Sequence, residues 1–111
     1  MNRPRYIWWR YIKTVIRRYA ECPDVLSASE YSAVQRAVMF TRSLTDGELR
    51  LRLIQLVLWN RTHTIAGAAI MLYISESTAQ DWHAQFVKSV AVSLGLKLRV
   101  TEPKKRGIIR S

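Results

Sequence analysis

The side chains that most often carry out chemistry are few in this sequence. It contains one cysteine, Cys22, and two histidines, His63 and His83. A structural zinc site needs about four such ligands, usually in Cys-x-x-Cys or His-x-x-x-His spacing, and neither spacing occurs. A nucleophilic pair of Cys22 with a histidine stays open from the residues alone. A lone cysteine beside Pro23, at the end of a predicted helix, favours a structural role instead.

Phosphate-binding loops and acidic metal sites are also missing from the pattern. The glycines form no Gly-rich loop, and the acidic residues form no carboxylate cluster of the kind that metal-dependent nucleases use. The sequence therefore predicts no catalysis, no bound metal and no cofactor. We expect His83, which follows Trp82 in a predicted helix, to lie on the surface or beside a phosphate.

A polar stretch in the second half of the chain has side chains that can read DNA. Gln80 is the best candidate for contacting a base edge, and Ser77 and Thr78 are suited to contacting phosphate. Glu76 and Asp81 bring negative charge to the same surface, and no arginine accompanies them. The DNA-contacting residues predicted here are Ser75, Glu76, Ser77, Thr78, Gln80, Asp81 and Ala84.

Positive charge is the strongest signal in the composition. Eighteen Lys and Arg residues against eight Asp and Glu give a net charge of +10. A domain this basic usually binds a polyanion, most often nucleic acid, although an excess of charge that serves solubility is the alternative. The charge gathers in two basic arms, residues 1–19 and the last ten residues, around a nearly neutral middle. The predicted phosphate-contacting residues are Arg10, Lys13, Arg17, Arg61, His63, Lys88, Lys104, Lys105 and Arg106.

Helical periodicity predicts the elements that would position these side chains. In residues 6–19 the apolar spacing predicts an amphipathic helix with one apolar and one cationic face. The apolar face is formed by Trp8, Ile12, Val15 and Tyr19. Three interpretations remain open for the cationic face: a solvated surface, a phosphate-binding surface, or a surface that lies on a membrane.

Two capping-box patterns mark the next helix starts. Ser27 with Glu30 predicts a helix that runs to about Arg42, and Thr45 with Glu48 predicts a second one. We expect the first to bury Tyr31, Val34 and Val38. The second, which continues to about residue 60, has an apolar stripe so broad that it should be the central helix: Leu49, Leu53, Ile54, Leu56, Val57 and Leu58.

Two further helices are separated by a short polar break. Thr64 can cap a helix over about 65–72, Ser75 can cap a second over 76–94, and Gly95 can end it. Two helices joined by so short a turn predict a helix-turn-helix. Tyr73 occupies the turn position where glycine is usual. The inner positions of the motif are apolar: Ala69, Leu72, Ile74, Ala79 and Trp82.

The stretch from Leu44 to Trp82 resembles the C-terminal promoter-binding domain of sigma factors. It is still more similar to small bacteriophage transcription regulators of the ArpU and RinA type, which carry that sigma-like module. The leading basic, aromatic helix in RYIWWRYIKTVIRRYAECP and the later Tyr31-Ser32-Ala33-Val34 match the pattern of these regulators. The resemblance covers about residues 6–95. It implies a DNA-binding regulator of phage late genes in the bacterial host cytoplasm, with Ser75 to Ala84 on the recognition helix.

The sequence thus predicts an all-α fold, a compact bundle of about five helices containing a helix-turn-helix. We expect one helical domain over 1–96, with the sigma-like module at 44–94, and a basic tail over 97–111 whose start, LKLRV, could be extended. No apolar run is long enough to span a membrane, no signal peptide is visible, and the single cysteine fits a reducing cytoplasm.

The predicted partner is double-stranded DNA, with RNA polymerase as a further candidate and with homo-oligomerisation open. Three alternatives compete with a transcription regulator. One is the small terminase subunit of a phage packaging machine, and another is a protein-interaction module whose acidic helix contacts RNA polymerase. The third is binding to a membrane surface through residues 6–19.

Overall fold

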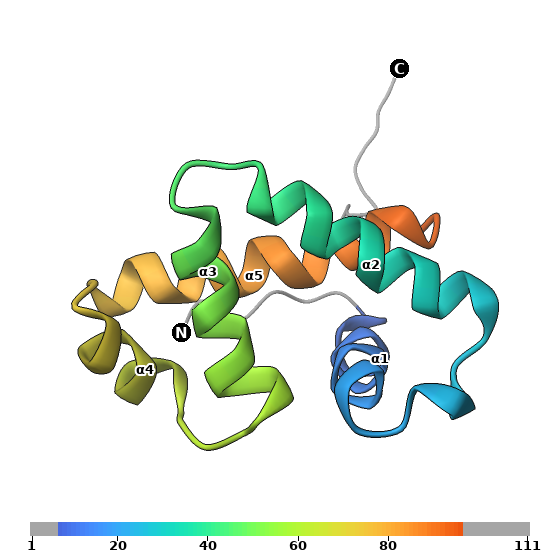
Figure 1. Ribbon diagram of the computed structural model, residues 1–111, viewed down its shortest axis with the longest axis horizontal. Helices are drawn as coiled ribbons and strands as arrows, with labels where there is room; N and C mark the ends of the chain where they lie inside the picture. The colour runs from blue at the N-terminus through green and yellow to red at the C-terminus, as the bar shows by residue number, and fades with distance from the viewer. Residues whose placement is uncertain (1–6, 97–111) are drawn as a thin grey trace.

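The computed structural model describes residues 7–96, and the regular elements in this range are all helical (Figure 1). The predicted all-α fold with about five helices is therefore confirmed. The predicted basic tail and residues 97–100 of the LKLRV segment lie outside the described residues. In chain order the elements are α1 (Trp9–Glu21), the 3-10 turn η1 (Pro23–Val25), α2 (Ala28–Arg42), α3 (Gly47–Ile54), the π-helical turn η2 (Gln55–Trp59), α4 (Ile65–Leu72) and α5 (Glu76–Ser93).

Hydroxyl side chains begin three of these helices as predicted. The Oγ of Ser27 accepts a hydrogen bond from the Glu30 amide, and the Glu30 carboxylate accepts one from the Ser27 amide, which completes a capping box. Thr64 and Ser75 each accept a hydrogen bond from the amide three residues later. Each cap satisfies a backbone donor that the first helical turn leaves unpaired.

The second predicted capping box is wrong. Asp46, not Thr45, precedes the helix; it has a left-handed backbone (φ 60°) and makes no side-chain cap hydrogen bond. The Glu48 carboxylate lies 3.4 Å from Arg42 instead. The reason is a tight approach between α2 and α3, because a Cβ on Gly47 would overlap the last carbonyl oxygens of α2. Glycine is required at this position by that approach rather than by φ.

Two hydrophobic clusters form the interior. The larger cluster joins α1, α2, α3, η2 and α5, and consists of Ile12, Val15, Ile16, Ala33, Val34, Ala37, Leu51, Ile54, Leu58, Phe86, Val87, Val90 and Ala91. The smaller cluster joins α3, α4 and α5, and consists of Leu53, Ala68, Ala69, Leu72 and Ala79. Helix α5 contributes to both and packs against each of the other four α-helices. It runs through the middle of the molecule in Figure 1. The segment predicted as the central helix, residues 48–60, also packs against α1, α2, α4 and α5, so it shares the central position with α5.

The segment predicted as one helix over 48–60 divides in two. After Ile54 the backbone widens into a π-helical turn, closed by the Asn60 amide on the Gln55 carbonyl at 2.7 Å. The indole Nε1 of Trp59 then donates a hydrogen bond to the Ile16 carbonyl at 3.0 Å. The turn therefore ties α3 to α1, a link between distant segments that helical periodicity does not predict.

Two further expectations about the first helices need correction. Helix α1 begins at Trp9 and ends at Glu21, so it starts and ends later than predicted. Tyr31 is exposed, and its ring lies 5.0 Å from the ring of Tyr19 on the surface between α1 and α2. Its predicted companion Val34 is fully buried.

Candidate nucleic-acid interface

The junction between α4 and α5 is a tight backbone closure. Helix α4 ends when Tyr73 adopts a left-handed conformation (φ 61°). The Ile74 amide reaches back to the Ala69 carbonyl at 3.0 Å, which satisfies an end carbonyl as in a Schellman motif. The next residue, Ser75, is extended and begins α5. The two helices are thus separated by three residues, with a large aromatic side chain where glycine would be unstrained.

The back of this junction is packed by small side chains. Ala68, Ala69, Leu72 and Ala79 are buried, and Ile74 and Trp82 pack against them while partly exposed. The predicted inner positions are therefore on the inside. Alanine side chains allow the two helix backbones to approach closely, so the beginning of α5 is held in one orientation relative to α4.

A polar surface faces outward from the first turns of α5, although less evenly than expected. Ser75, Glu76, Ser77 and Asp81 are exposed, whereas Thr78, Gln80 and Ala84 are half-buried. The Ser75 hydroxyl accepts from the Thr78 amide and donates to Thr78 Oγ1 at 2.8 Å. These two hydroxyls are therefore engaged at the helix start, whereas the Ser77 hydroxyl has a longer contact, 3.4 Å, with Ser75 Oγ.

Gln80 is held by one of the two acids on this surface. Its Nε2 atom donates a hydrogen bond to Glu76 Oε2 at 3.2 Å, across one helical turn. The predicted base-reading side chain is thereby oriented, and its Oε1 atom is left to accept a hydrogen bond. Glu76 thus acquires a structural role as the partner of Gln80. Asp81 is fully on the outside of α5.

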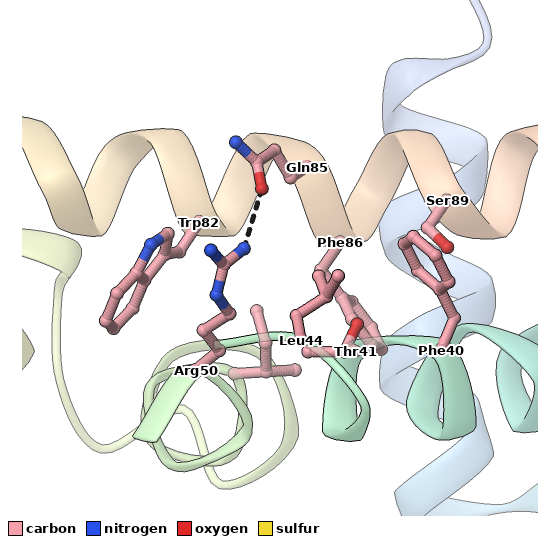
Figure 2. A pocket seen from close by; sticks show the side chains of 9 residues that line it. Phe40, Thr41, Leu44, Arg50, Trp82, Gln85, Phe86 and Ser89 are labelled. Carbon is pink, nitrogen blue, oxygen red and sulfur yellow. Dashed lines mark hydrogen bonds between the residues drawn. The ribbon is translucent and has the colours of Figure 1, made fainter. Parts of the chain in front are cut away.

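Arg50 of α3 holds the next turn of α5, a role that the sequence patterns do not predict. Figure 2 shows its guanidinium between Trp82 and Gln85. The guanidinium lies 5.0 Å from the centre of the Trp82 ring, and Nη1 donates to Gln85 Oε1 at 2.8 Å. Its Nε atom donates to the Thr45 carbonyl at 3.0 Å. Arg50 stands out as a charged residue in a predicted apolar helix. The sequence does not indicate which residues it contacts.

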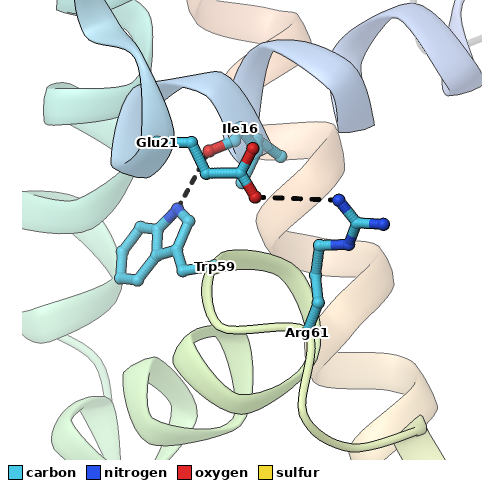
Figure 3. Close-up of polar contacts among 4 residues, drawn as sticks. All are labelled: Ile16, Glu21, Trp59 and Arg61. Carbon is cyan, nitrogen blue, oxygen red and sulfur yellow. Dashed lines mark hydrogen bonds and ion pairs between the residues drawn. The ribbon is translucent and has the colours of Figure 1, made fainter.

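The loop before α4 contains two of the predicted phosphate-contacting residues. Arg61 has a left-handed backbone (φ 56°), and its Nη1 atom lies 3.6 Å from Glu21 Oε2 at the end of α1 (Figure 3). His63 is half-buried and shares a hydrogen bond of 2.9 Å with the hydroxyl of Thr62. The Arg61 pair is exposed, so it contributes about 0–1 kcal/mol and can be exchanged for another anion.

The other predicted cations are spread over the molecule. Arg10 is exposed on α1, Lys13 and Arg17 are half-buried there, and Lys88 is half-buried on α5. The rings of Trp9 and His83 are 6.2 Å apart, which shows that the start of α1 lies against α5. This contact brings the first cations of α1 near the middle of α5. Lys104, Lys105 and Arg106 lie outside the described residues.

His83 is buried, so the expectation that it lies on the surface is wrong. It is 5% exposed, and its Nε2 atom has no hydrogen-bond partner among the described residues. Burial, assisted by the positive charge of Lys13, lowers the pKa of His83 from 6.5 to about 4. The imidazole is therefore neutral at physiological pH and acts as part of the interior between α1 and α5.

Residues 7–96 offer neither a metal-binding cluster nor a membrane-spanning helix. No group of three or more His, Cys, Asp or Glu side chains in this range is arranged to hold a metal ion. None of the helices in the same range is both long enough and apolar enough to cross a lipid bilayer. Cys22 is exposed at the end of α1.

Comparison with known proteins gave no match. None of the family models, curated proteins or solved structures corresponds to this sequence.

Proposed function

We propose that this protein binds duplex DNA through a helix-turn-helix formed by α4 and α5, and acts as a transcription regulator. The observation that carries the proposal is the junction itself. A second helix starts on the Ser75 cap after three residues, is packed from behind by alanines, and presents polar side chains at its exposed N-terminal end. That end of the second helix is the part that enters the major groove in helix-turn-helix proteins.

The charge of the chain supports a polyanionic partner. The net charge is +10, although α5 itself begins with Glu76 and carries Asp81. We expect most of the electrostatic attraction to DNA to come from cations outside the polar surface of α5, including Arg10 on α1 and the basic tail. The polar end of α5 then contributes base contacts, with Gln80 oriented by Glu76.

The resemblance to phage regulators of the ArpU and RinA type extends the proposal to late-gene control in a bacterial host. On that basis the site is Ser75 to Ala84. No catalytic activity, metal or cofactor is proposed.

Binding of a fluorescently labelled duplex at increasing salt concentration tests the proposal. Because released counterions drive such binding, the association constant should fall by at least about tenfold between 50 and 200 mM salt. Complete absence of binding at 50 mM salt would contradict the proposal.

Two substitutions distinguish contacts that recognise the base sequence from contacts that supply electrostatic attraction to DNA. Selection from a random-sequence duplex pool should give a different preferred sequence for Gln80→Ala than for the wild type. Lys88→Ala should weaken all sequences about equally, since a phosphate contact carries no sequence information. Gln55→Ala, on the exposed side of η2, is the matched control and should change neither property.

The exposed acids on α5 favour a second candidate function, a protein-interaction module that contacts RNA polymerase. Glu76 and Asp81 are both exposed and would repel phosphate. Capture of polymerase by the wild type, but not by a Glu76→Lys, Asp81→Lys variant, together with no DNA affinity, would favour this function. A ring of many subunits in light scattering would instead favour a small terminase subunit.

A further inference from the structure

A groove crosses the surface where α2, α3 and α5 meet, beside the Arg50 brace. It has a volume of about 670 Å³, within the range of about 300–1,000 Å³ that ligand sites occupy. Phe40, Leu44 and Val92 form its apolar surface, and Phe40 and Val92 are more than half exposed. A small cavity of about 20 Å³ shares Arg50 and Gln85 with the lining of the groove and is also lined by Trp82 and Phe86. Figure 2 shows these side chains.

The rim of this groove is cationic. Arg36 from α2, Arg50 from α3 and Lys88 from α5 are among the nine residues that line it, and none of the nine is acidic. Arg50 is already fixed by the Thr45 carbonyl and by Gln85, so its position is set before any ligand arrives. An apolar strip with positive charge from three separate helices around it is complementary to an apolar ligand surface flanked by negative charge.

We propose that this groove docks an acidic amphipathic helix of a protein partner. Such a helix would insert apolar side chains, spaced i, i+3, i+4 and i+7, between Phe40, Leu44 and Val92. Its flanking carboxylates would meet the guanidinium groups of Arg36 and Arg50, which pair well with carboxylates, and the ammonium group of Lys88.

Three other occupants fit the groove less well. DNA phosphates would use the cations but leave the exposed Phe40 and Val92 uncovered. The chain's own C-terminal residues are basic, with Lys104, Lys105 and Arg106, and would be repelled. A second copy also carries a net charge of +10, which opposes self-association.

The groove is adjacent to the polar surface at the start of α5 and shares one residue, Lys88, with the predicted phosphate-contacting residues. Lys88 and Gln85 line the groove and lie one to two helical turns beyond Asp81 on α5. A docked partner would therefore sit beside the reading end of α5. The inference concerns protein recognition and does not depend on DNA binding, so it is tested with no DNA present.

The probe is a labelled peptide of about 18 residues, long enough to form a helix on binding, with leucines at the four spaced positions and glutamates on the flanks. Fluorescence anisotropy should give a Kd of about 10–100 μM for the full-length protein. A scrambled peptide of the same composition controls for non-specific attraction to a basic protein and should bind at least about tenfold more weakly. Equal binding of the two peptides would overturn the proposal.

Paired variants locate the binding. Arg36→Glu should weaken the peptide about tenfold, whereas Arg52→Glu, the same charge change on an exposed residue of α3 outside the groove lining, should change it little. Val92→Ser should also weaken binding, whereas Ile70→Ser, at an exposed isoleucine of α4, should not. Circular dichroism of each variant checks that the helices are retained. Equal effects within either pair would overturn the proposal.

Two further outcomes would assign the groove to another occupant and also overturn the proposal. Concentration-dependent self-association in sedimentation that Arg36→Glu abolishes would identify a second copy. Displacement of the peptide by a short duplex, combined with no effect of Val92→Ser, would identify phosphate.

Discussion

The C-terminal half of α5 packs in the larger cluster, where Phe86, Val87 and Val90 fill the space between α1, α2 and α3. Its N-terminal end rests on the smaller cluster, which consists of three alanines and two leucines. One half is thus held by large buried side chains from most of the chain. The N-terminal half is held by the close approach of the α4 and α5 backbones, by helix caps and by the contacts of Arg50.

This difference suits the proposed role of α5 in contacting DNA. The well-packed half fixes α5 in the molecule, and the sparsely packed end can project its polar side chains without burying them. The cost is that the projecting end has few contacts that resist distortion. Substitutions in the two halves should therefore differ in what they disrupt: the whole fold for the larger cluster, and the orientation of the α5 N-terminus for the smaller one.

The largest effect is expected for Phe86→Ala in the larger cluster. Phe86 is 2% exposed, and its truncation should lower the free energy of unfolding by about 3–5 kcal/mol through lost burial and the cavity left behind. Leu72→Ala in the smaller cluster, at 9% exposure, should cost about 2 kcal/mol. Urea unfolding followed by tryptophan fluorescence measures both. A larger loss for Leu72→Ala would reverse the assignment of the two clusters.

The next effect is a dependence of stability on pH through His83. Its pKa is lowered from 6.5 to about 4, so the folded state favours the neutral ring more than the unfolded state does. The contribution is complete above pH 6.5 and is lost as the pH falls from 6.5 to 4, by about 3 kcal/mol in total. His83→Phe should remove most of the dependence of the unfolding free energy on pH in this window. An unchanged slope in His83→Phe would contradict the burial argument.

A smaller effect is expected at the start of α5. Ser75→Ala removes the side-chain acceptor for the Thr78 amide and should lower the free energy of unfolding by about 1 kcal/mol. Because the cap orients the candidate interface, DNA affinity should fall as well. Ser27→Ala removes the equivalent cap on α2 and is the matched control: a similar loss of stability with unchanged affinity. Equal losses of DNA affinity in Ser75→Ala and Ser27→Ala would show that the affinity depends only on the stability of the fold.

The smallest effect should be a gain in the free energy of unfolding, on substitution of Tyr73. Tyr73 has φ 61° and is 95% exposed, so its side chain contributes almost no burial to offset a strained backbone. Tyr73→Gly relieves about 1–2 kcal/mol of strain and adds backbone entropy to the unfolded chain. The net gain in unfolding free energy should be about 0.5 kcal/mol. A loss of stability would mean that the tyrosine makes a stabilising contact.

Local signals in the sequence predicted much of this fold. Caps depend on a few adjacent residues, and Ser27, Thr64 and Ser75 all begin helices as their spacing indicates. Gly95 likewise follows α5 with a left-handed backbone (φ 83°). The inner positions of the α4–α5 pair were predicted from the apolar pattern that a helix-turn-helix requires.

Features set by distant segments could not be predicted in this way. Asp46 replaces Thr45 as the residue before α3 because α2 approaches Gly47. His83 is buried because α1 places Trp9 against it, and neighbouring residues in the sequence do not reveal that contact. For the candidate site, residue types indicated the polar surface of α5. The bond between Gln80 and Glu76 and the Arg50 brace depend on side-chain positions that only the folded chain provides.

A charge-matched pair of variants tests the central claim, that the start of α5 faces DNA. Asp81→Lys and Asp24→Lys change the net charge equally, and both sites are exposed, but Asp24 lies in η1, far along the chain from α5. Binding of a random-sequence duplex at 50 mM salt should strengthen at least about tenfold for Asp81→Lys, through one added phosphate contact. Asp24→Lys should change affinity less than about twofold. Equal strengthening by both variants would show that DNA senses only the total charge and would contradict the assignment of α5.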